Sequence, residues 1–375
     1  MSVAGAWLHD GSSASSGDSI QSGDENADVR VVTVDDSSNW SFRRKARAWL
    51  ATTAAAVAAD HPRVFELGGE RVWILQSGRF SAGQTLDSYL LVRGDFSCGA
   101  GCRFQRPIYA GGDCEIGKGT RLESVTAEGR LSLLPGAEVR GDAESGGLME
   151  IRSGCRIQAL AQSRTAIRLG VQAAAGQLFA PAITTPPGLN TAGALPHPPR
   201  SGVAVLPAPG DHPDNRSTRV EGIDPRRLRP LGAETWVYAG DLTLRAPVLL
   251  RSHLVVEGGF TCAAGSLLEG DVRTAGALRL GERSVARANL WAEGDLVVGA
   301  GCVLQGEVRS QQMLRLCAGV RALRAGGPVS VLAAGELSVE EDVSVRGRIA
   351  SSYRVMAISA AVMGLRRAAA GGRGA

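Results

Sequence analysis

Two cysteines in the stretch RGDFSCGAGCRF, residues 93–104, have a spacing that could support chemistry. Three residues separate Cys98 from Cys102, and thiolates at short spacing can bind a metal ion or form a redox pair. The chain has seven cysteines, an odd number, and none of them forms a C-x-x-C motif. Such a set disfavours a zinc site and a disulfide framework. We therefore interpret the cysteines as buried apolar residues in a reducing cytoplasm.

The other candidates for chemistry are also weak. Residues 112–120, GDCEIGKGT, come close to a phosphate-binding loop, but Gly119 stands where Ser or Thr is needed. Of the five histidines only His253 lies outside the expected tails and linker, and we interpret it as structural. The aspartates that directly follow recurring glycines are interpreted as turn residues that bind their own backbone, namely Asp95, Asp113, Asp241 and Asp295. No catalytic, cofactor-binding or metal-binding residue is predicted, and an enzyme is not expected.

Composition bounds the class of protein. The 375 residues include 49 Gly but only seven Phe, six Trp and four Tyr. This composition favours thin layers of stacked aliphatic side chains with frequent turns. The length allows about two domains. The net charge is +4, and the arginines in the body of the chain are scattered among acids, so no nucleic-acid partner is expected.

Charge segregates near the ends of the chain. Residues 1–40 carry seven acids and one Arg and predict a disordered acidic tail, whereas residues 41–63 are basic. Residues 352–375 form a basic tail rich in Ala and Gly. Between the two halves, residues 176–231 hold 11 of the 16 prolines and predict a semi-extended linker.

The segment NWSFRRKARAWLATTAAAVAAD, residues 39–60, allows three interpretations. One is a basic amphipathic helix at a membrane surface. An export signal is the second, although its position and its weak apolar run disfavour it. The third is an Ala-rich helix that packs on the following domain. For the first, the contact residues would be Trp40, Phe42, Arg43, Arg44, Lys45, Arg47, Trp49 and Leu50. No segment has the ~20 apolar residues needed to span a bilayer.

A repeat determines the predicted fold. Gly240, Gly258, Gly276 and Gly294 recur every 18 residues, and the first half has the same period with one interval of 17. Residues two, four and ten positions after each glycine are mostly apolar, and those eight positions after it are small. This spacing predicts two short strands and two corners per coil, stacked as a parallel β-helix. Two such modules are expected, at residues 70–175 and 233–351.

The two modules are similar to each other and to a known family. SYLLVRGDFSCGAG (88–101) matches SHLVVEGGFTCAAG (252–265), which indicates an internal duplication. GDLVVGAGCVLQGEV (294–308) resembles the coils of bactofilins, bacterial polymer-forming cytoskeletal proteins. The resemblance implies a right-handed β-helix, assembly through the helix ends without nucleotide, and often a membrane-binding segment near the N-terminus. Two modules joined by a linker depart from the usual single core.

The resemblance predicts a function. We expect a cytoplasmic scaffold that binds further copies of itself as filaments or oligomers, with the inner membrane surface as a second partner. The alternative is a hexapeptide-type β-helix transferase or a carbohydrate-binding β-helix. IGKGTRL (116–122) resembles one hexapeptide coil, but that fold needs an aliphatic residue every six positions, and the spacing here is uneven.

Overall fold

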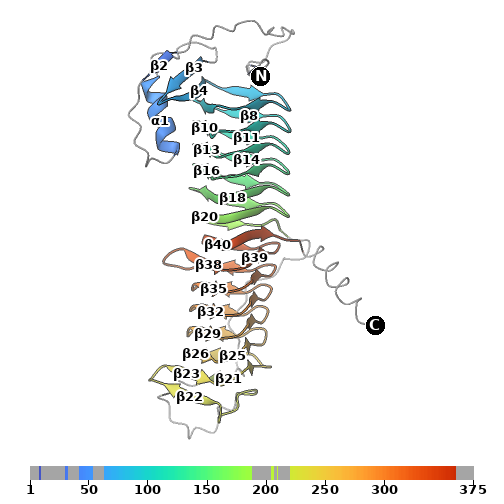
Figure 1. Ribbon diagram of the computed structural model, residues 1–375. Coiled ribbons are helices and arrows are strands. Elements are labelled where there is room, and N and C mark those ends of the chain that lie inside the picture. Colours follow the sequence, from blue (N-terminus) through green and yellow to red (C-terminus); the bar gives the residue numbers. More distant parts are fainter. Residues whose placement is uncertain are drawn as a thin grey trace. The chain divides into compact units, whose positions relative to one another are not determined.

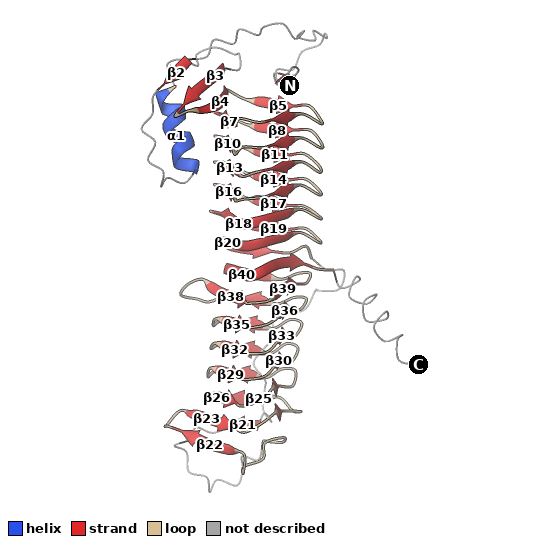
Figure 2. Ribbon diagram, in the orientation of Figure 1, coloured by secondary structure: helices blue, strands red, loops and turns tan. Residues whose placement is uncertain are grey.

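The computed structural model describes residues 8–9, 30–32, 42–53, 63–187, 204–206, 209 and 220–359. These described residues are all-β apart from one helix, α1 (Phe42–Thr52). The chain divides into two compact units, Met1–Ala173 and Ala174–Ala375, and each contains a stack of parallel β-coils (Figures 1 and 2). The predicted fold class is therefore confirmed. Most of the two predicted tails lies outside the described residues.

The coils of the first unit have three strands each, which stack in register on three faces. Face A contains β4 (Glu70–Leu75), β7 (Tyr89–Val92), β10 (Ile108–Ala110), β13 (Val125–Ala127) and β16 (Ala143–Ser145). Face B contains β5 (Gly78–Phe80), β8 (Phe96–Cys98), β11 (Cys114–Ile116), β14 (Leu131–Leu133), β17 (Met149–Ile151) and β19 (Ile167–Leu169). Face C contains β6 (Thr85–Leu86), β9 (Arg103–Phe104), β12 (Arg121–Leu122), β15 (Glu138–Val139) and β18 (Arg156–Ser163), and β18 continues onto face A.

The second unit repeats this arrangement. Its face A contains β23 (Thr235–Tyr238), β26 (His253–Val256), β29 (Val272–Thr274), β32 (Leu290–Ala292), β35 (Val308–Ser310) and β38 (Val329–Ala333). Face B contains β24 (Leu242–Thr243), β27 (Phe260–Thr261), β30 (Leu278–Leu280), β33 (Leu296–Val298), β36 (Leu314–Leu316) and β39 (Glu336–Val339). Face C contains β25 (Val248–Leu250), β28 (Leu267–Leu268), β31 (Val285–Ala286), β34 (Val303–Leu304) and β37 (Arg321–Ala322). The long strand β40 (Ser344–Ala357) closes the stack by pairing with β37, β38 and β39.

The strands on face A correct the sequence prediction, which expected two strands per coil. Their inward residues mix sizes, as in Ile108 with Ala110 and Ala143 with Ser145, so they do not form a uniform apolar column. The inward hydroxyls instead donate to carbonyls at the corner that follows face A. Ser163 Oγ, for example, donates to the Gly147 carbonyl in the preceding coil at 2.7 Å. A strand with small and polar inward residues shows only a weak alternation of apolar and polar residues in the sequence.

The recurring Gly-Asp corners form ladders between coils. The aspartate does not bind its own backbone, as the sequence suggests, but accepts the amide N–H of the next coil. Asp95 Oδ1 accepts the Asp113 N–H at 2.8 Å, and Asp113 Oδ1 accepts the Arg130 N–H at 2.7 Å. The glycine leaves room for this bond, because a Cβ at Gly112 would lie 2.1 Å from Asp95 Oδ1. Only some corners carry this charge-assisted bond, but the close approach is general: a Cβ would lie 2.8 Å from the Gly259 nitrogen at Gly276 and 2.9 Å from the Ala277 nitrogen at Gly294.

The small position of each coil also has a hydrogen-bonding role. Its side chain donates to a carbonyl of the preceding corner, from a thiol as well as from a hydroxyl. Cys102 Sγ donates to the Ser81 carbonyl at 3.0 Å, and Thr120 Oγ1 donates to the Gly99 carbonyl at 3.2 Å. A short donor of either kind fits, so Cys, Ser and Thr alternate there. The glycine before this position adopts a left-handed backbone conformation, with φ of 71° at Gly101.

Additional strands extend the terminal coils. In the first unit, β1 (Leu8–His9) pairs antiparallel with β5, and β2 (Arg30–Val32) pairs with β3 (Arg63–Leu67), which is antiparallel to β4. In the second unit, β21 (Ala204–Leu206) pairs with β25, and β22 (Leu228–Leu231) is antiparallel to β23.

The strand β20 (Ala174–Thr184) lies inside the segment predicted as linker. It pairs antiparallel with β40, from Ala174 opposite Met356 to Thr184 opposite Ser344. Leu178, Ala180 and Ile183 are buried, and the ladder is irregular between Ala180 and Ile183, where Pro181 stands. Proline is tolerated at such an irregularity. The proline content therefore concealed a strand.

Candidate functional site

The helix α1 carries seven of the eight residues predicted to contact a membrane, and Trp40 lies outside the described residues. Its Ala, Leu and Arg residues favour a helix. However, it has no acid in its first turn, and Arg43, Arg44 and Lys45 oppose the positive end of the helix dipole. At its other end, Thr53 Oγ1 donates to the Trp49 carbonyl at 2.8 Å. An isolated helix of 11 residues is marginal, so packing must supply its stability.

The apolar side of α1 packs on the outer surface of face A in the first unit. Ala46 and Trp49 are 0% and 1% exposed. The residues that surround them are Phe65, Leu67, Val72, Ile74, Leu91 and Tyr109, with Phe42, Leu50 and Tyr89 at the margin. The ring centroid of Trp49 lies 5.4 Å from that of Tyr89, and Lys45 Nζ lies 4.7 Å from the centroid of the Trp49 ring. The helix thus adds a second layer to the sheet.

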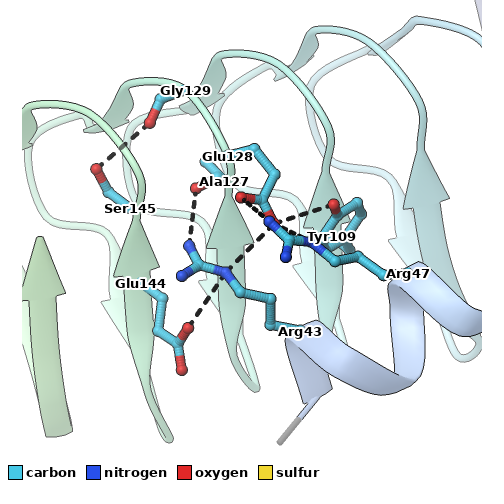
Figure 3. Close-up of polar contacts among 8 residues, drawn as sticks. All are labelled: Arg43, Arg47, Tyr109, Ala127, Glu128, Gly129, Glu144 and Ser145. Carbon is cyan, nitrogen blue, oxygen red and sulfur yellow. Dashed lines mark hydrogen bonds and ion pairs between the residues drawn. The ribbon is translucent and has the colours of Figure 1, made fainter. Parts of the chain in front are cut away.

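The polar side of α1 converges on one carboxylate of face A (Figure 3). Arg47 donates to Glu128 from Nε at 3.0 Å and from a terminal nitrogen at 2.7 Å, and the Tyr109 hydroxyl donates to Glu128 Oε1 at 3.0 Å. Arg43 Nε lies 3.3 Å from Glu128 and 3.6 Å from Glu144. A second nitrogen of Arg43 donates to the Ala127 carbonyl at 3.3 Å. Bidentate pairing of this kind fixes orientation as well as distance.

The RGD tripeptide of residues 93–95 is part of this structure. A terminal nitrogen of Arg93 donates to the Leu50 carbonyl at 3.4 Å, near the end of α1. Asp95 belongs to the corner ladder described above. Both charged side chains therefore have structural partners within the first unit.

The arrangement of α1 bears on the membrane prediction. Trp49 is buried, Phe42 and Leu50 are partly buried against the sheet, and Arg43 and Lys45 are partly buried as well. Arg44 and Arg47 are exposed. The third interpretation of this segment, a helix that packs on the following domain, describes what α1 does in the structure. Membrane contact by α1 stays a prediction.

The ion pairs under α1 predict a response to acid. Burial opposes ionisation of Glu128, but hydrogen bonds from Arg47 and Tyr109 and the charge of Arg43 outweigh it and lower the pKa of this carboxyl. A carboxyl with a lowered folded-state pKa stabilises the docked helix fully above its unfolded pKa, about 4.3, and loses that contribution as the pH falls through the folded value.

We therefore expect hydrogen exchange of the α1 amides to accelerate as the pH falls below about 4.3, after correction for intrinsic exchange rates. Glu128→Gln should show fast exchange already at neutral pH and little further change with acid. Identical acid responses in the two proteins would contradict this role of Glu128.

Face B of the first unit carries a shallow groove of about 630 Å³. Polar and charged side chains line it, among them Arg79, Glu115, Arg130 and Glu150. Glu150 is paired with Arg130 at 2.9 Å and with Arg168 at 3.3 Å, so its carboxylate is engaged within the fold. Asp95 and Asp113, also at the groove, hold the corner ladder.

The residues first considered for chemistry have structural positions. All seven cysteines are free, and all but Cys317 are buried. Burial raises the pKa of the Cys302 thiol to about 12, which disfavours a thiolate there, whereas a hydrogen bond with Cys98 lowers the pKa of the Cys102 thiol to about 7. His253 Nδ1 accepts the Asp271 N–H at 3.0 Å, a ladder bond between coils.

The described parts of the chain hold neither a metal-binding cluster nor a membrane-spanning helix. They contain no group of three His, Cys, Asp or Glu side chains that could hold a metal ion. No described helix is both long and apolar enough to cross a bilayer. Comparison with known proteins finds no family model that matches the chain, no similar curated protein and no similar solved structure.

Proposed function

We propose that the protein is a structural scaffold of the bactofilin type, which associates with further copies of itself through coil ends and without nucleotide. The observation that carries the proposal is the pairing of β20 with β40. A terminal coil accepts a further strand in antiparallel orientation, and that strand comes from more than 150 residues earlier in the chain. Coil ends of this fold can therefore be extended by strand pairing, which is the chemistry that end-to-end assembly requires.

Two strand edges at the ends of the second unit, those of β40 and β22, are protected against such extension. The edge of β40 is occupied by β20. At the other end, β22 and β23 form an antiparallel pair in which the Arg227 carbonyl accepts the Ala239 N–H. Hydrogen-bonded and non-hydrogen-bonded residue pairs alternate along such a ladder, so the backbone polar groups of Leu228 and Pro230 point away from β23. The Leu228 N–H donates to the Pro225 carbonyl, and proline has no N–H. This outer edge of β22 therefore offers few donors to another strand, as protected edges do.

The first unit offers a better edge. Of the described strands, only β9 pairs with β6, and Arg103 and Gln105 donate to the carbonyls of Gln84 and Leu86. Thr85, which lies between them and is exposed, then directs its N–H and carbonyl away from β9. Since the edges of β40 and β22 are occupied or protected and that of β6 is open, we expect small closed oligomers, above all dimers, in preference to long filaments.

Sedimentation velocity and electron microscopy of the full chain without nucleotide test the proposal. A concentration-dependent dimer or small oligomer is expected. Thr85→Pro, which removes the outward N–H of β6, should weaken association at least tenfold, whereas Thr85→Val keeps that N–H and should associate as the wild type does. A strictly monomeric protein at all concentrations would refute the proposal. Association that Thr85→Pro leaves unchanged would refute the assigned edge.

A further inference from the structure

The outer surface of face C in the second unit carries an apolar column. Leu249, Leu267, Val285 and Val303 lie directly above one another in the parallel ladder. They point away from the core, because their neighbours Leu250, Leu268, Ala286 and Leu304 are the inward residues of the same strands. The column is therefore not required by the packing of the coils.

The same column of the first unit is polar. There the outward residues of face C are Thr85, Arg103, Arg121, Glu138 and Arg156. Four of these are exposed, and Arg121 pairs with Glu138 at 3.1 Å. In the second unit Leu267 is only 7% exposed although it points outward, and Leu249, Val285 and Val303 are partly buried. The two modules share a coil pattern but differ at this surface.

The chain itself lies at both ends of the apolar column. At one end, the Thr185 N–H donates to the Val343 carbonyl at 3.0 Å, and the Asp342 N–H donates to the Pro186 carbonyl at 2.7 Å. These residues directly precede Ser344, which stacks on Arg321 of face C. At the other end, Val205 of β21 pairs with Leu249 and so begins the column. Residues 188–203 connect these two points.

Length and composition suit this segment to the column. From β25 to β40, face C advances by five coils, or ~24 Å at ~4.8 Å per strand. Sixteen residues in an extended, proline-rich chain reach ~50 Å at ~3.1 Å each, which leaves ample slack. The segment GLNTAGALPHPPRSGV contains Leu189, Leu195, Val203 and three prolines, and Arg200 is its only charged residue apart from His197.

We infer that residues 188–203 dock along the column formed by Leu249, Leu267, Val285 and Val303. The segment then covers apolar side chains that the coils leave outside, whereas the matching column of the first unit is mostly charged and offers no such apolar surface. It also shields this apolar column from contacts with other molecules. This inference does not depend on self-association.

Limited trypsin digestion tests the docking, because cleavage after Arg200 requires the segment to leave the column. We expect Val285→Glu to raise the initial rate of this cleavage at least tenfold, as followed by mass spectrometry of the two fragments. The matched control is Val297→Glu, an outward valine of face B in the same unit, which should leave the rate unchanged.

The wild-type chain gives an independent result should Val285→Glu fail to fold. If Arg200 is cleaved as fast in the full chain as in a synthetic peptide of residues 188–206, the segment is not docked and the inference is wrong. It is equally wrong if Val285→Glu changes the sedimentation coefficient but not the cleavage rate, since the column would then bind a second copy of the chain.

Discussion

Replacing Trp49 by Ala is expected to release α1 from the first unit. The side chain is 1% exposed and packs between Tyr89, Lys45 and the sheet. Removing a buried aromatic side chain of this size costs about 3–5 kcal/mol. The helix has only 11 residues, so the loss of this contact removes a large part of the packing that holds it on the sheet. We therefore expect the α1 amides to lose their protection against hydrogen exchange while the coils keep theirs.

Trp291 provides the matched control, because it is the outward tryptophan of face A in the second unit and is 39% exposed. Trp291→Ala should change the free energy of unfolding by about 0.5 kcal/mol or less, as is usual for surface substitutions. Equal effects of the two substitutions would show that Trp49 is not a packing residue. Liposome flotation of the same Trp49→Ala protein separates packing from lipid contact, since only the lipid role predicts weaker membrane binding by an otherwise folded chain.

The residue pattern of α1 does not identify the surface on which the helix packs. Aromatic and basic residues on opposite sides of a short helix fit a membrane surface and a β-sheet surface equally well. The difference lies in the partner, namely Glu128 and Tyr109, which are more than 55 residues beyond the end of α1 in sequence. The outer surface of face A carries large residues, Leu91 and Tyr109, at positions where a solvent-facing strand usually has polar residues. That was the signal available in the sequence.

The coil itself was predictable because its rules repeat. Each corner glycine and each inward residue occurs many times, so a single exception such as Cys98 does not obscure the pattern. The strand of each coil on face A and the strand β20 were not predicted, for a physical reason. The strand on face A tolerates Ala and Ser inward because corner carbonyls accept the serine hydroxyls, and β20 occurs once, so no repeat supports it. Its buried alternation of Leu178 and Ala180 is short and ends at Pro181.

The largest effect in the second unit is expected at Glu340. Its Oε1 accepts a bond from Arg315 Nε at 2.7 Å, and its Oε2 accepts the Ala318 N–H at 2.9 Å. Its backbone carbonyl accepts the Thr185 hydroxyl at 2.7 Å, next to the end of β20. The Glu340 side chain is 8% exposed and that of Arg315 is 24% exposed. Glu340 therefore supports the last turn of the stack through its carboxylate and contacts the end of the capping strand through its backbone carbonyl.

Glu340→Ala should lower the free energy of unfolding of the second unit by about 3–5 kcal/mol, because it leaves a shielded guanidinium without its counter-charge. Glu336→Ala is the control, since its partner Arg354 is 45% exposed and such pairs contribute only about 0–1 kcal/mol. Urea unfolding measures both, and hydrogen exchange should show β20 among the first amides to lose protection in Glu340→Ala. If the two variants unfold at the same urea concentration, Glu340 does not link the terminal coil to β20. In that case the ladder between β20 and β40, together with Thr185, which accepts the Val343 N–H at 2.9 Å, holds the strand without the Glu340 carboxylate.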